Sequence, residues 1–338
     1  MQQVVLGIDI GGTTTKIGLV DKAGKILGEA SVPTPVNTSG VRPEAFVQQL
    51  HDKIVQLQSA EKHSILAVGI GAPNASYYSG AIEYAANLPW QHEVAPIAQL
   101  FEKYFPNIPV KLTNDANAAA LGEMLYGGAR GMKDFIVVTL GTGLGSGVVC
   151  NGQLLYGSDG FAGELGHTTV IPNGRACGCG RRGCLENYVS ATGIKQTAFE
   201  VISRRYFTEP SLLKKLSFLD MTAKDIADAA AQGDSIALEV FDQTAKMLAC
   251  GLANAIAITS PEAIFIYGGL AKAGDLLIAP TRRYLNEQVL KNFCKRDVNG
   301  KLLQEARTKV ALSELNDKNG AVLGAAALGW NEVRKQEQ

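Results

Sequence analysis

The sequence contains one pattern twice, and this repeat limits the folds that the chain can adopt. Each copy reads as an apolar strand, a turn rich in Gly and Thr, a second strand, a tight turn and a third strand; the copies cover residues 4–31 and 135–156. A single such turn is common, because Gly readily adopts positive φ angles, and each copy alone is explained as a plain β-hairpin. Two copies in the same register predict two related halves, each of which presents a backbone loop to one ligand.

The segments between and after the repeats predict an α/β chain. Residues 65–72 and 263–267 read as short buried strands, which are typical of parallel sheets. Apolar residues at helical spacing predict a helix that starts near residue 43 and further helices over residues 221–232, 235–260, 276–293 and 319–330. We divide the chain into a smaller N-terminal domain, residues 1–118 with about 315–338, and a larger domain, residues 119–314.

Length and charge restrict the kind of partner. With 338 residues the chain is long enough for two domains, each with its own core. Its 32 Lys and Arg residues balance 32 Asp and Glu residues, so no basic field is available to hold a nucleic acid or an anionic membrane. We therefore expect a small-molecule ligand, with neither a nucleic acid nor a membrane as partner.

The N-terminus, MQQVVLGIDI, has neither the basic start nor the cleavage site of a signal peptide. No stretch approaches the roughly 20 apolar residues that span a bilayer. We therefore expect a cytoplasmic protein, in which the six cysteines are free thiols, catalytic groups or metal ligands rather than disulfides.

The two Gly-rich turns have the composition of anion-binding loops. They are DIGGTTTK, residues 9–16, and LGTGLGSG, residues 140–147. Consecutive N–H groups in such turns converge on an anion, and the hydroxyls add donors. Neither turn is a Walker A loop, and the GxGxxG string at residues 178–183 lies among cysteines, where a dinucleotide fingerprint would not be found. Asp9 either positions a nucleotide-bound Mg²⁺ through water or caps its turn.

Together with IYGGL, residues 266–270, these segments resemble the two phosphate loops and the adenosine loop of the sugar kinase/Hsp70/actin superfamily. The resemblance implies a duplicated α/β fold of the actin-like, ribonuclease-H-like type, in which two domains flank a cleft that binds ATP with Mg²⁺. The residues that it assigns to ATP are Asp9, Gly11, Gly12, Thr13, Thr14, Lys16, Gly141, Thr142, Gly143, Gly268 and Gly269.

The segment LTNDANAAALGE, residues 112–123, reads as a strand end and an Ala-rich helix that begins at Asn114 and Asp115. Either residue can be the N-cap, and a plain cap is the simpler interpretation. Only one can be that cap, which leaves the other to face a ligand. Phosphoryl transfer to an alcohol needs a group that orients the hydroxyl and accepts its proton. We expect Asp115 to do this as an ionised carboxylate, because a helix N-terminus favours the charged form.

Four residues have the spacing H-x₉-C-x-C-x₄-C: His167, Cys177, Cys179 and Cys184. Three thiols and an imidazole are the donors of a closed tetrahedral zinc site, the usual make-up of a structural site. Free or oxidised cysteines are the alternative, and a reducing compartment together with the tight spacing favours zinc. The remaining cysteines lie in apolar contexts and are expected in the core: Cys150, Cys250 and Cys294.

Two glutamates flank this cluster. Glu164 comes shortly before His167, and Glu186 follows Cys184. A metal that immobilises the segment would fix both carboxylates, and carboxylates accept hydrogen bonds from sugar hydroxyls. Capping or solvation is the ordinary alternative for a glutamate.

The strings GELGH, residues 163–167, and CGCGRRGCLE, residues 177–186, resemble the signature of the ROK (repressor, open reading frame, kinase) family. The resemblance implies a glucokinase-like sugar kinase that forms a homodimer or homotetramer, with Asp115 as catalytic base. The sugar-binding residues that it implies are Asn87, Asn114, Asp115, Glu164, His167 and Glu186, with the backbone around Gly71. His167 would then contact zinc with one ring nitrogen and sugar with the other.

The resemblance leaves other functions open. Sugar-sensing repressors of the family carry a helix-turn-helix domain before the first phosphate loop, and with that loop at Asp9 we expect none here. A sugar-binding protein without activity is disfavoured, because Asp115 and both loops are present. The runners-up to glucose kinase are N-acetylmannosamine, N-acetylglucosamine and fructose kinases; glucose is preferred from its frequency in the family and not from any residue.

Overall fold

A computed structural model describes residues 1–35, 41–60, 63–85, 87–316 and 319–337. The chain forms two compact units. Unit 1 comprises Met1–Gly131, Leu154–Gly163 and Asp317–Gln338, and unit 2 comprises Met132–Gln153 and Glu164–Asn316. This division differs from the expected boundary at residue 118, because helix α3 (Asp115–Tyr126) continues through that position and stays whole within unit 1. No helix in the described ranges is long and apolar enough to cross a membrane.

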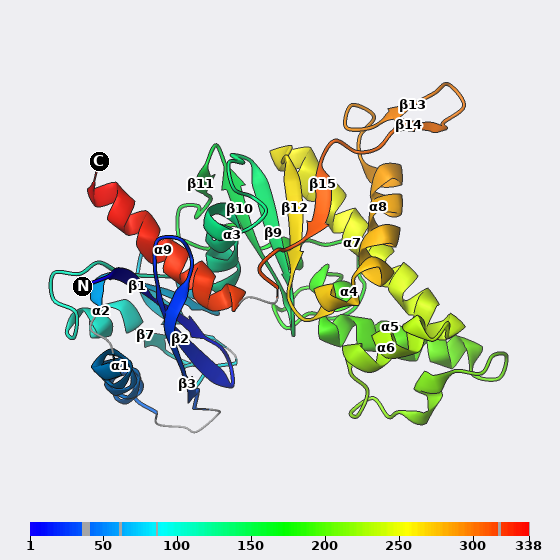
Figure 1. The fold of residues 1–338 in the computed structure, drawn as a ribbon. Helices are drawn as coiled ribbons and strands as arrows, with labels where there is room; N and C mark the ends of the chain where they lie inside the picture. The colour runs from blue at the N-terminus through cyan, green and yellow to red at the C-terminus, as the bar shows by residue number, and fades with distance from the viewer. Residues whose placement is uncertain (36–40, 61–62, 86, 317–318, 338) are drawn as a thin grey trace. The chain divides into compact units, whose positions relative to one another are not determined.

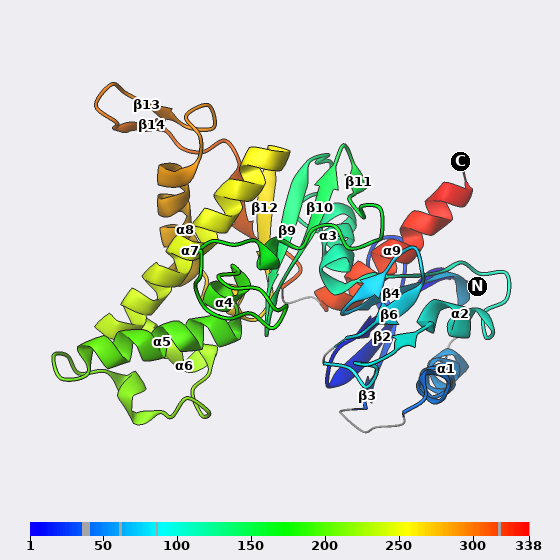
Figure 2. The same ribbon diagram turned by 180° about the vertical axis from the view of Figure 1, so that it is seen from behind.

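The centre of unit 1 is a five-stranded sheet with the order β3-β2-β1-β4-β8. Strands β1, β2 and β3 are labelled in Figure 1 and β4 in Figure 2. Its strands are β1 (Gln3–Ile10), β2 (Thr14–Val20), β3 (Ile26–Pro33), β4 (Ser64–Ala72) and β8 (Val110–Asn114). β1, β2 and β3 pair antiparallel in succession, which confirms the predicted meander. β1, β4 and β8 are parallel, so their carboxyl ends lie at one edge of the sheet.

Helices cover both faces of this sheet. They are α1 (Pro43–Ala60), α2 (Ile97–Glu102), α3 and α9 (Gly320–Gln336); a small sheet of β5 (Ala75–Ser76), β6 (Ala81–Glu83) and β7 (Val94–Ala95) completes the unit. Alternate residues of β1, such as Leu6 and Ile8, share a core with Phe46 and Leu50 of α1. The intervening positions of β1 face α9, because a side chain added at Gly7 would meet its backbone.

Helix α9 packs against its neighbours at backbone distance. A Cβ atom at Gly69 of β4 would lie 1.9 Å from the Ala325 carbonyl oxygen, and one at Gly324 would lie 2.5 Å from the Ala118 carbonyl oxygen of α3. Only hydrogen atoms fit at these contacts. The predicted close packing of this Gly- and Ala-rich helix is confirmed, and it fixes α3, which begins at Asp115, against the rest of unit 1.

The sheet of unit 2 has the order β11-β10-β9-β12-β15. Its strands are β9 (Phe135–Leu140), β10 (Leu144–Cys150), β11 (Gln153–Leu154), β12 (Ala263–Tyr267) and β15 (Lys309–Leu312). As in unit 1, the central strand pairs antiparallel with the strand that follows it and parallel with the strand on its other side. The repeat read from the sequence is therefore a repeat of topology. The second turn is shorter than expected, because β10 already begins at Leu144 and only Gly141–Gly143 connect the strands.

The rest of unit 2 is mainly helical, as predicted. Its helices are α4 (Glu186–Val189), α5 (Ala191–Arg205), α6 (Ala223–Ala231), α7 (Ser235–Thr259) and α8 (Asp275–Gln288), with short 3₁₀ segments at Leu165–His167, Leu212–Lys215 and Leu270–Ala273 and a hairpin of β13 (Lys295–Arg296) and β14 (Leu302–Gln304). Helices α7 and α8 lie side by side in Figures 1 and 2. α7 ends where expected, with Ser260 in the left-handed conformation. α8 ends five residues before the predicted 293, because Val289 is extended.

We predict that Gly324→Ala destabilises the protein although Ala is the better helix former. Intrinsic propensity favours Ala by about 1 kcal/mol, whereas forcing a methyl group into a filled backbone contact costs about 1–3 kcal/mol. Urea unfolding should therefore show a lower midpoint. Gly269→Ala is the control, since Gly269 has helical φ and ψ angles and no atom within 4 Å of an added Cβ. A Gly324→Ala midpoint at or above that of the wild type would refute the packing argument.

Candidate active site

The carboxyl-end edge of the unit 1 sheet brings together two predicted site residues: Asp9, assigned to the nucleotide, and Asp115, assigned to catalysis. Asp9 of β1 is aligned with Gly71 of β4, and Gly71 is aligned with Thr113 of β8. Helix α3 begins two residues after Thr113, so Asp115 lies at the same edge as Asp9. A side chain at Gly71 would crowd Ala118 and lie 3.8 Å from the Asp115 Cα, so the strand and the helix start are in close contact.

Asn114 and Asp115, at the start of α3, both accept a hydrogen bond from the same backbone N–H. Asn114 is the N-cap, and its side-chain oxygen accepts a hydrogen bond from the Ala116 N–H at 2.9 Å. Asp115 Oδ1 accepts from the same N–H at 2.8 Å. The expectation that one residue would cap and the other stay free is therefore wrong for Asp115 Oδ1. Oδ2 has no hydrogen bond to the described residues, so a ligand can meet this second oxygen.

Both aspartates have raised pKa values. The pKa of Asp9 is raised to about 6, mainly by burial and also by the negative charge of Asp115, while Lys16 opposes the shift. Burial among protein atoms also raises the pKa of Asp115, although water still reaches its side chain, and the Ala116 N–H opposes the shift. We expected an ionised Asp115 without a raised pKa from its place at a helix N-terminus. The direction is the opposite, because desolvation outweighs the helix end.

The first Gly-rich loop leaves two backbone donors available. The Gly11 N–H is bonded to the Thr14 carbonyl at 3.2 Å, while the N–H groups of Gly12 and Thr13 have no acceptor among the described residues. Asn87 lies beside this loop, since a Cβ at Gly12 would be 3.2 Å from its carbonyl oxygen. The structure therefore brings this loop and Asn87 together within unit 1, and both end-of-strand aspartates lie in the same unit.

The second Gly-rich loop repeats this pattern in unit 2. The Gly141 N–H bonds the Gly143 carbonyl at 3.0 Å, and the N–H groups of Thr142 and Gly143 lack an acceptor in the described part of the chain. In both loops the first glycine closes the turn, and the next two residues keep their donors free. Convergent N–H groups of this kind suit an anion such as a phosphate.

The Gly-Gly turn after β12 contains a residue that the sequence analysis missed. Gly268 has a φ angle of 107°, and its N–H donates to Asn316 Oδ1 at 2.8 Å. Gly269 has open space where a side chain would be. Asn316 therefore holds the turn in place. No motif marks this asparagine, because it follows Gly268 by 48 residues.

The predicted metal ligands converge. The donor atoms of His167, Cys177, Cys179 and Cys184 all lie within 4.8 Å of one another. Cys179 Sγ and Cys184 Sγ are 3.7 Å apart, and Cys177 Sγ is 3.6 Å from His167 Nδ1. Zn–S bonds of about 2.3 Å in a tetrahedron separate two sulfur atoms by about 3.8 Å, so the spacing fits zinc. Burial and the neighbouring thiols raise the pKa of Cys184 to about 12, so a bound cation would be needed to keep this thiol ionised at neutral pH.

Both glutamates lie beside this cluster. Glu164 Oε2 is 3.9 Å from His167 Nε2, the ring nitrogen that does not face Cys177. Glu186 Oε1 is 4.0 Å from Cys177 Sγ, and its Oε2 accepts the Leu144 N–H at 2.9 Å. The cluster and the second Gly-rich loop are thus connected within unit 2.

Arg175 is a further residue that the sequence analysis missed. Its side chain is 14% exposed and pairs with Glu200 at 2.8 Å. The guanidinium also donates to the carbonyl oxygens of Asn187 and Gly193 at 2.6 and 3.1 Å. It therefore joins the cysteine loop to helices α4 and α5. The surrounding Gly- and Arg-rich sequence gave no reason to select this arginine.

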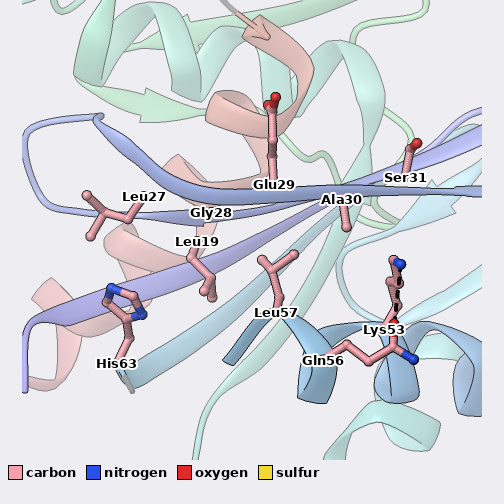
Figure 3. Close-up of a pocket in the computed structure, with 10 residues that line it drawn as sticks. All are labelled: Leu19, Leu27, Gly28, Glu29, Ala30, Ser31, Lys53, Gln56, Leu57 and His63. Carbon is pink, nitrogen blue, oxygen red and sulfur yellow. Dashed lines mark hydrogen bonds between the residues drawn. The ribbon is translucent and has the colours of Figure 1, made fainter. Parts of the chain in front are cut away.

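A pocket of about 780 Å³ lies elsewhere in unit 1, along β3 and α1 (Figure 3). Its walls include Leu19, Leu57 and Lys53, and Lys53 donates a hydrogen bond to Gln56 at 3.3 Å. None of the predicted site residues lines it. Its size alone therefore gives it no part in the candidate site.

Comparison with known proteins gives concordant results. A family model described as the ROK family matches residues 5–332. A glucokinase of Halalkalibacterium halodurans is 38% identical and aligns with 84% of this chain and 86% of its own. The structure of a ROK family glucokinase from Streptomyces griseus, in complex with glucose and AMPPNP, has 32% identity and a TM-score of 0.76, over 97% of this chain and 99% of that one. A xylose repressor of Caldicellulosiruptor bescii is 29% identical over 96% of this chain and 77% of the repressor.

We predict that Asp9→Asn stabilises the ligand-free protein at pH 7.5. A carboxyl whose pKa is about 6 when folded and 3.8 otherwise holds its proton more tightly in the folded state. Its contribution to stability is complete below about pH 4 and is lost as the pH rises to about 6, a change on the order of 3 kcal/mol. The amide carries no such dependence. Urea unfolding at pH 5 and pH 7.5 should show that the free energy of unfolding of the variant increases relative to that of the wild type as the pH rises.

Asp228→Asn is the control, because the Asp228 side chain is 56% exposed and its partner, Lys224, stays charged across this pH range. This substitution should change the free energy of unfolding by the same amount at pH 5 and at pH 7.5. An Asp9→Asn variant that loses stability relative to the wild type between pH 5 and 7.5 would contradict the raised pKa.

Proposed function

The chain belongs to the ROK family, and we propose that it is an ATP-dependent hexose kinase that transfers the γ-phosphoryl group to the 6-hydroxyl of glucose. One observation carries this proposal: Asp115 and Asp9 lie at the same sheet edge as a Gly-rich loop with two unpaired N–H donors. A carboxylate for a hydroxyl and donors for phosphates are the parts that phosphoryl transfer requires. The relatives named glucokinase supply the choice of sugar.

In the proposed reaction Asp115 orients the sugar hydroxyl and receives its proton. The hydroxyl oxygen bonds to the γ-phosphorus while the bond from that phosphorus to ADP breaks, and the proton passes to the carboxylate. The Ala116 N–H fixes Oδ1, which leaves Oδ2 to meet the hydroxyl. The raised pKa of Asp115 makes it a better proton acceptor than an ordinary aspartate.

The nucleotide is proposed to bind through both Gly-rich loops. The N–H groups of Gly12, Thr13, Thr142 and Gly143 are the donors for its phosphates. Thr14 and Lys16 are exposed beside the first loop, and the open space at Gly269 suits the nucleoside. Mg²⁺ supplies positive charge that stabilises the ionised form of Asp9, and the raised pKa of that residue fits such a role.

The sugar hydroxyls are proposed to bind Asn87 and Asn114 of unit 1 and Glu164, His167 and Glu186 of unit 2. The arrangement of His167 supports a double role, because Nδ1 faces Cys177 while Nε2 faces Glu164. We propose zinc as the ion held by His167 and the three cysteines, where it would fix the loop that carries these groups. We place the reaction in the cytoplasm, which supplies ATP and keeps thiols reduced, in a homodimer or homotetramer.

The proposal predicts sugar-dependent release of ADP. A coupled assay with Mg-ATP should give the highest kcat/KM with glucose in a panel that also contains mannose, fructose, N-acetylglucosamine and N-acetylmannosamine. An amino sugar or fructose at the top of the panel would replace glucose as substrate. No turnover of any sugar would remove the kinase proposal and favour a sensor, the function named for the repressor relatives.

Asp115→Asn is the matched variant for this assay. It keeps the shape and one oxygen acceptor but cannot take the proton, so kcat should fall by about 10²–10⁴-fold while sugar binding, measured by calorimetry, remains. Activity within tenfold of the wild type would show that Asp115 is not the proton acceptor.

We predict about one zinc per chain in protein purified without chelator, measured by inductively coupled plasma mass spectrometry. Cys184→Ser should lose the metal and lower the unfolding temperature, because Cys184 is fully buried and the cluster replaces an apolar core in that loop. Cys250→Ser, outside the cluster, should keep the metal. A wild-type zinc content near zero would overturn the assignment.

A further inference from the structure

Glu186 makes two contacts that join different parts of the proposed site. Its Oε2 accepts the Leu144 N–H at 2.9 Å, and Leu144 is the first residue after the second Gly-rich loop. Its Oε1 lies 4.0 Å from Cys177 Sγ on the side of the metal cluster. Family resemblance assigns Glu186 only to the sugar. The bond to Leu144 connects the same carboxylate to the loop that we assign to the nucleotide.

The loop is shaped to receive this carboxylate. A Cβ atom at Gly143 would lie 2.5 Å from Glu186 Oε2, so any side chain there would displace the glutamate. The other end of the loop is held by the same segment, because the Ala191 N–H donates to the Gly141 carbonyl at 2.9 Å. Both ends of residues 141–144 are therefore bonded to residues 186–191.

The segment that holds the loop is itself rigid. Arg175 donates to the Asn187 carbonyl, and the Tyr188 hydroxyl accepts the Arg175 N–H at 2.9 Å. Leu185 and Val189, on either side, are fully buried. The backbone of Glu186 is therefore held rigidly, and its carboxylate can hold the loop in one position.

We propose that Glu186 positions the second phosphate loop and thereby couples sugar binding to nucleotide binding. The proposal rests on the proposed function for the sugar contact. A sugar hydroxyl that donates a hydrogen bond to Oε1 fixes the orientation of the carboxylate. Because Oε2 accepts the Leu144 N–H, the position of Leu144 is then fixed as well. The donors of Thr142 and Gly143 are then ordered before the nucleotide arrives. By linkage, nucleotide strengthens sugar binding by the same factor that sugar strengthens nucleotide binding.

The decisive measurement is nucleotide affinity without sugar, determined by calorimetry with Mg-ADP. Glu186→Ala should weaken sugar-free ADP binding by about tenfold, since a charge-assisted hydrogen bond to the loop is lost. Glu186→Gln should stay within about threefold of the wild type, because its amide oxygen still accepts the Leu144 N–H. A residue that serves the sugar alone would leave sugar-free ADP affinity unchanged in both variants, and that result would overturn the proposal.

Gly143→Ala tests the same contact from the loop side. Its methyl group should push the carboxylate away and reproduce the loss of ADP affinity with Glu186 intact. In the Glu186→Ala background the methyl group has room, so Gly143→Ala should add less than about twofold. Additive losses would mean that the methyl group obstructs the phosphate directly, and the proposal would fail.

Controls separate this proposal from folding and from the proposed function. Zinc content and unfolding temperature should match the wild type in Glu186→Gln. Glu239→Ala removes a carboxylate of α7 that pairs with Arg205, and it should leave ADP affinity unchanged. Glucose should strengthen ADP binding in the wild type and should lose this effect in Glu186→Ala. If no sugar of the panel binds the wild type, the proposed function fails, while the sugar-free ADP measurements still decide whether Glu186 positions the loop.

Discussion

Parallel strands deliver their carboxyl ends to one edge of a sheet, and the chemistry of this protein depends on that constraint. In unit 1 the ends of β1, β4 and β8 place Asp9, the backbone at Gly71 and the start of α3 together. In unit 2 the ends of β9 and β12 place the second Gly-rich loop and the Gly-Gly turn at the same edge. Because each loop follows its strand directly, the rigid sheet fixes where the loop begins, and contacts such as that of Glu186 with the Leu144 N–H hold the rest of it.

Their place at this edge of the sheet also explains why Asp9 and Asp115 have unusual pKa values. Burial raises the pKa of both aspartates, and the negative charge of Asp115 adds to the shift of Asp9. Lys16 offsets this only in part. In the cysteine loop, burial and the neighbouring thiols raise the pKa of Cys184 to about 12. In both units the protein gathers acidic groups whose ionised forms a bound cation would stabilise, which is consistent with metal-assisted chemistry at one place and a metal-held loop at the other.

Local sequence was sufficient for the features that depend on adjacent residues. The duplicated meander, a helix N-cap at Asn114 or Asp115, the end of α7 at Ser260 and the convergence of the four metal ligands follow from turn chemistry and spacing. The structure confirms each and places the cap at Asn114. Contacts between distant segments could not be read in this way. Asn316 reaches Gly268, Arg175 reaches Gly193, and Glu186 reaches Leu144 only after folding. The predicted direction of the Asp115 pKa shift was wrong, because a helix N-terminus can be recognised in the sequence, whereas the burial that desolvates the side chain cannot.

The close contact of α9 with β1, β4 and α3 also affects the order in which the two units can complete their cores during synthesis. The helix that fills the glycine-lined face of unit 1 follows unit 2 in sequence, while the strands that it covers come before unit 2. Unit 2 lies almost entirely between them in sequence. On the ribosome, where the N-terminal part emerges first, unit 2 can therefore complete its core while unit 1 still waits for its final helix. The candidate catalytic residue belongs to the unit that needs α9 for its core, so phosphoryl-transfer chemistry can begin only after α9 has been synthesised.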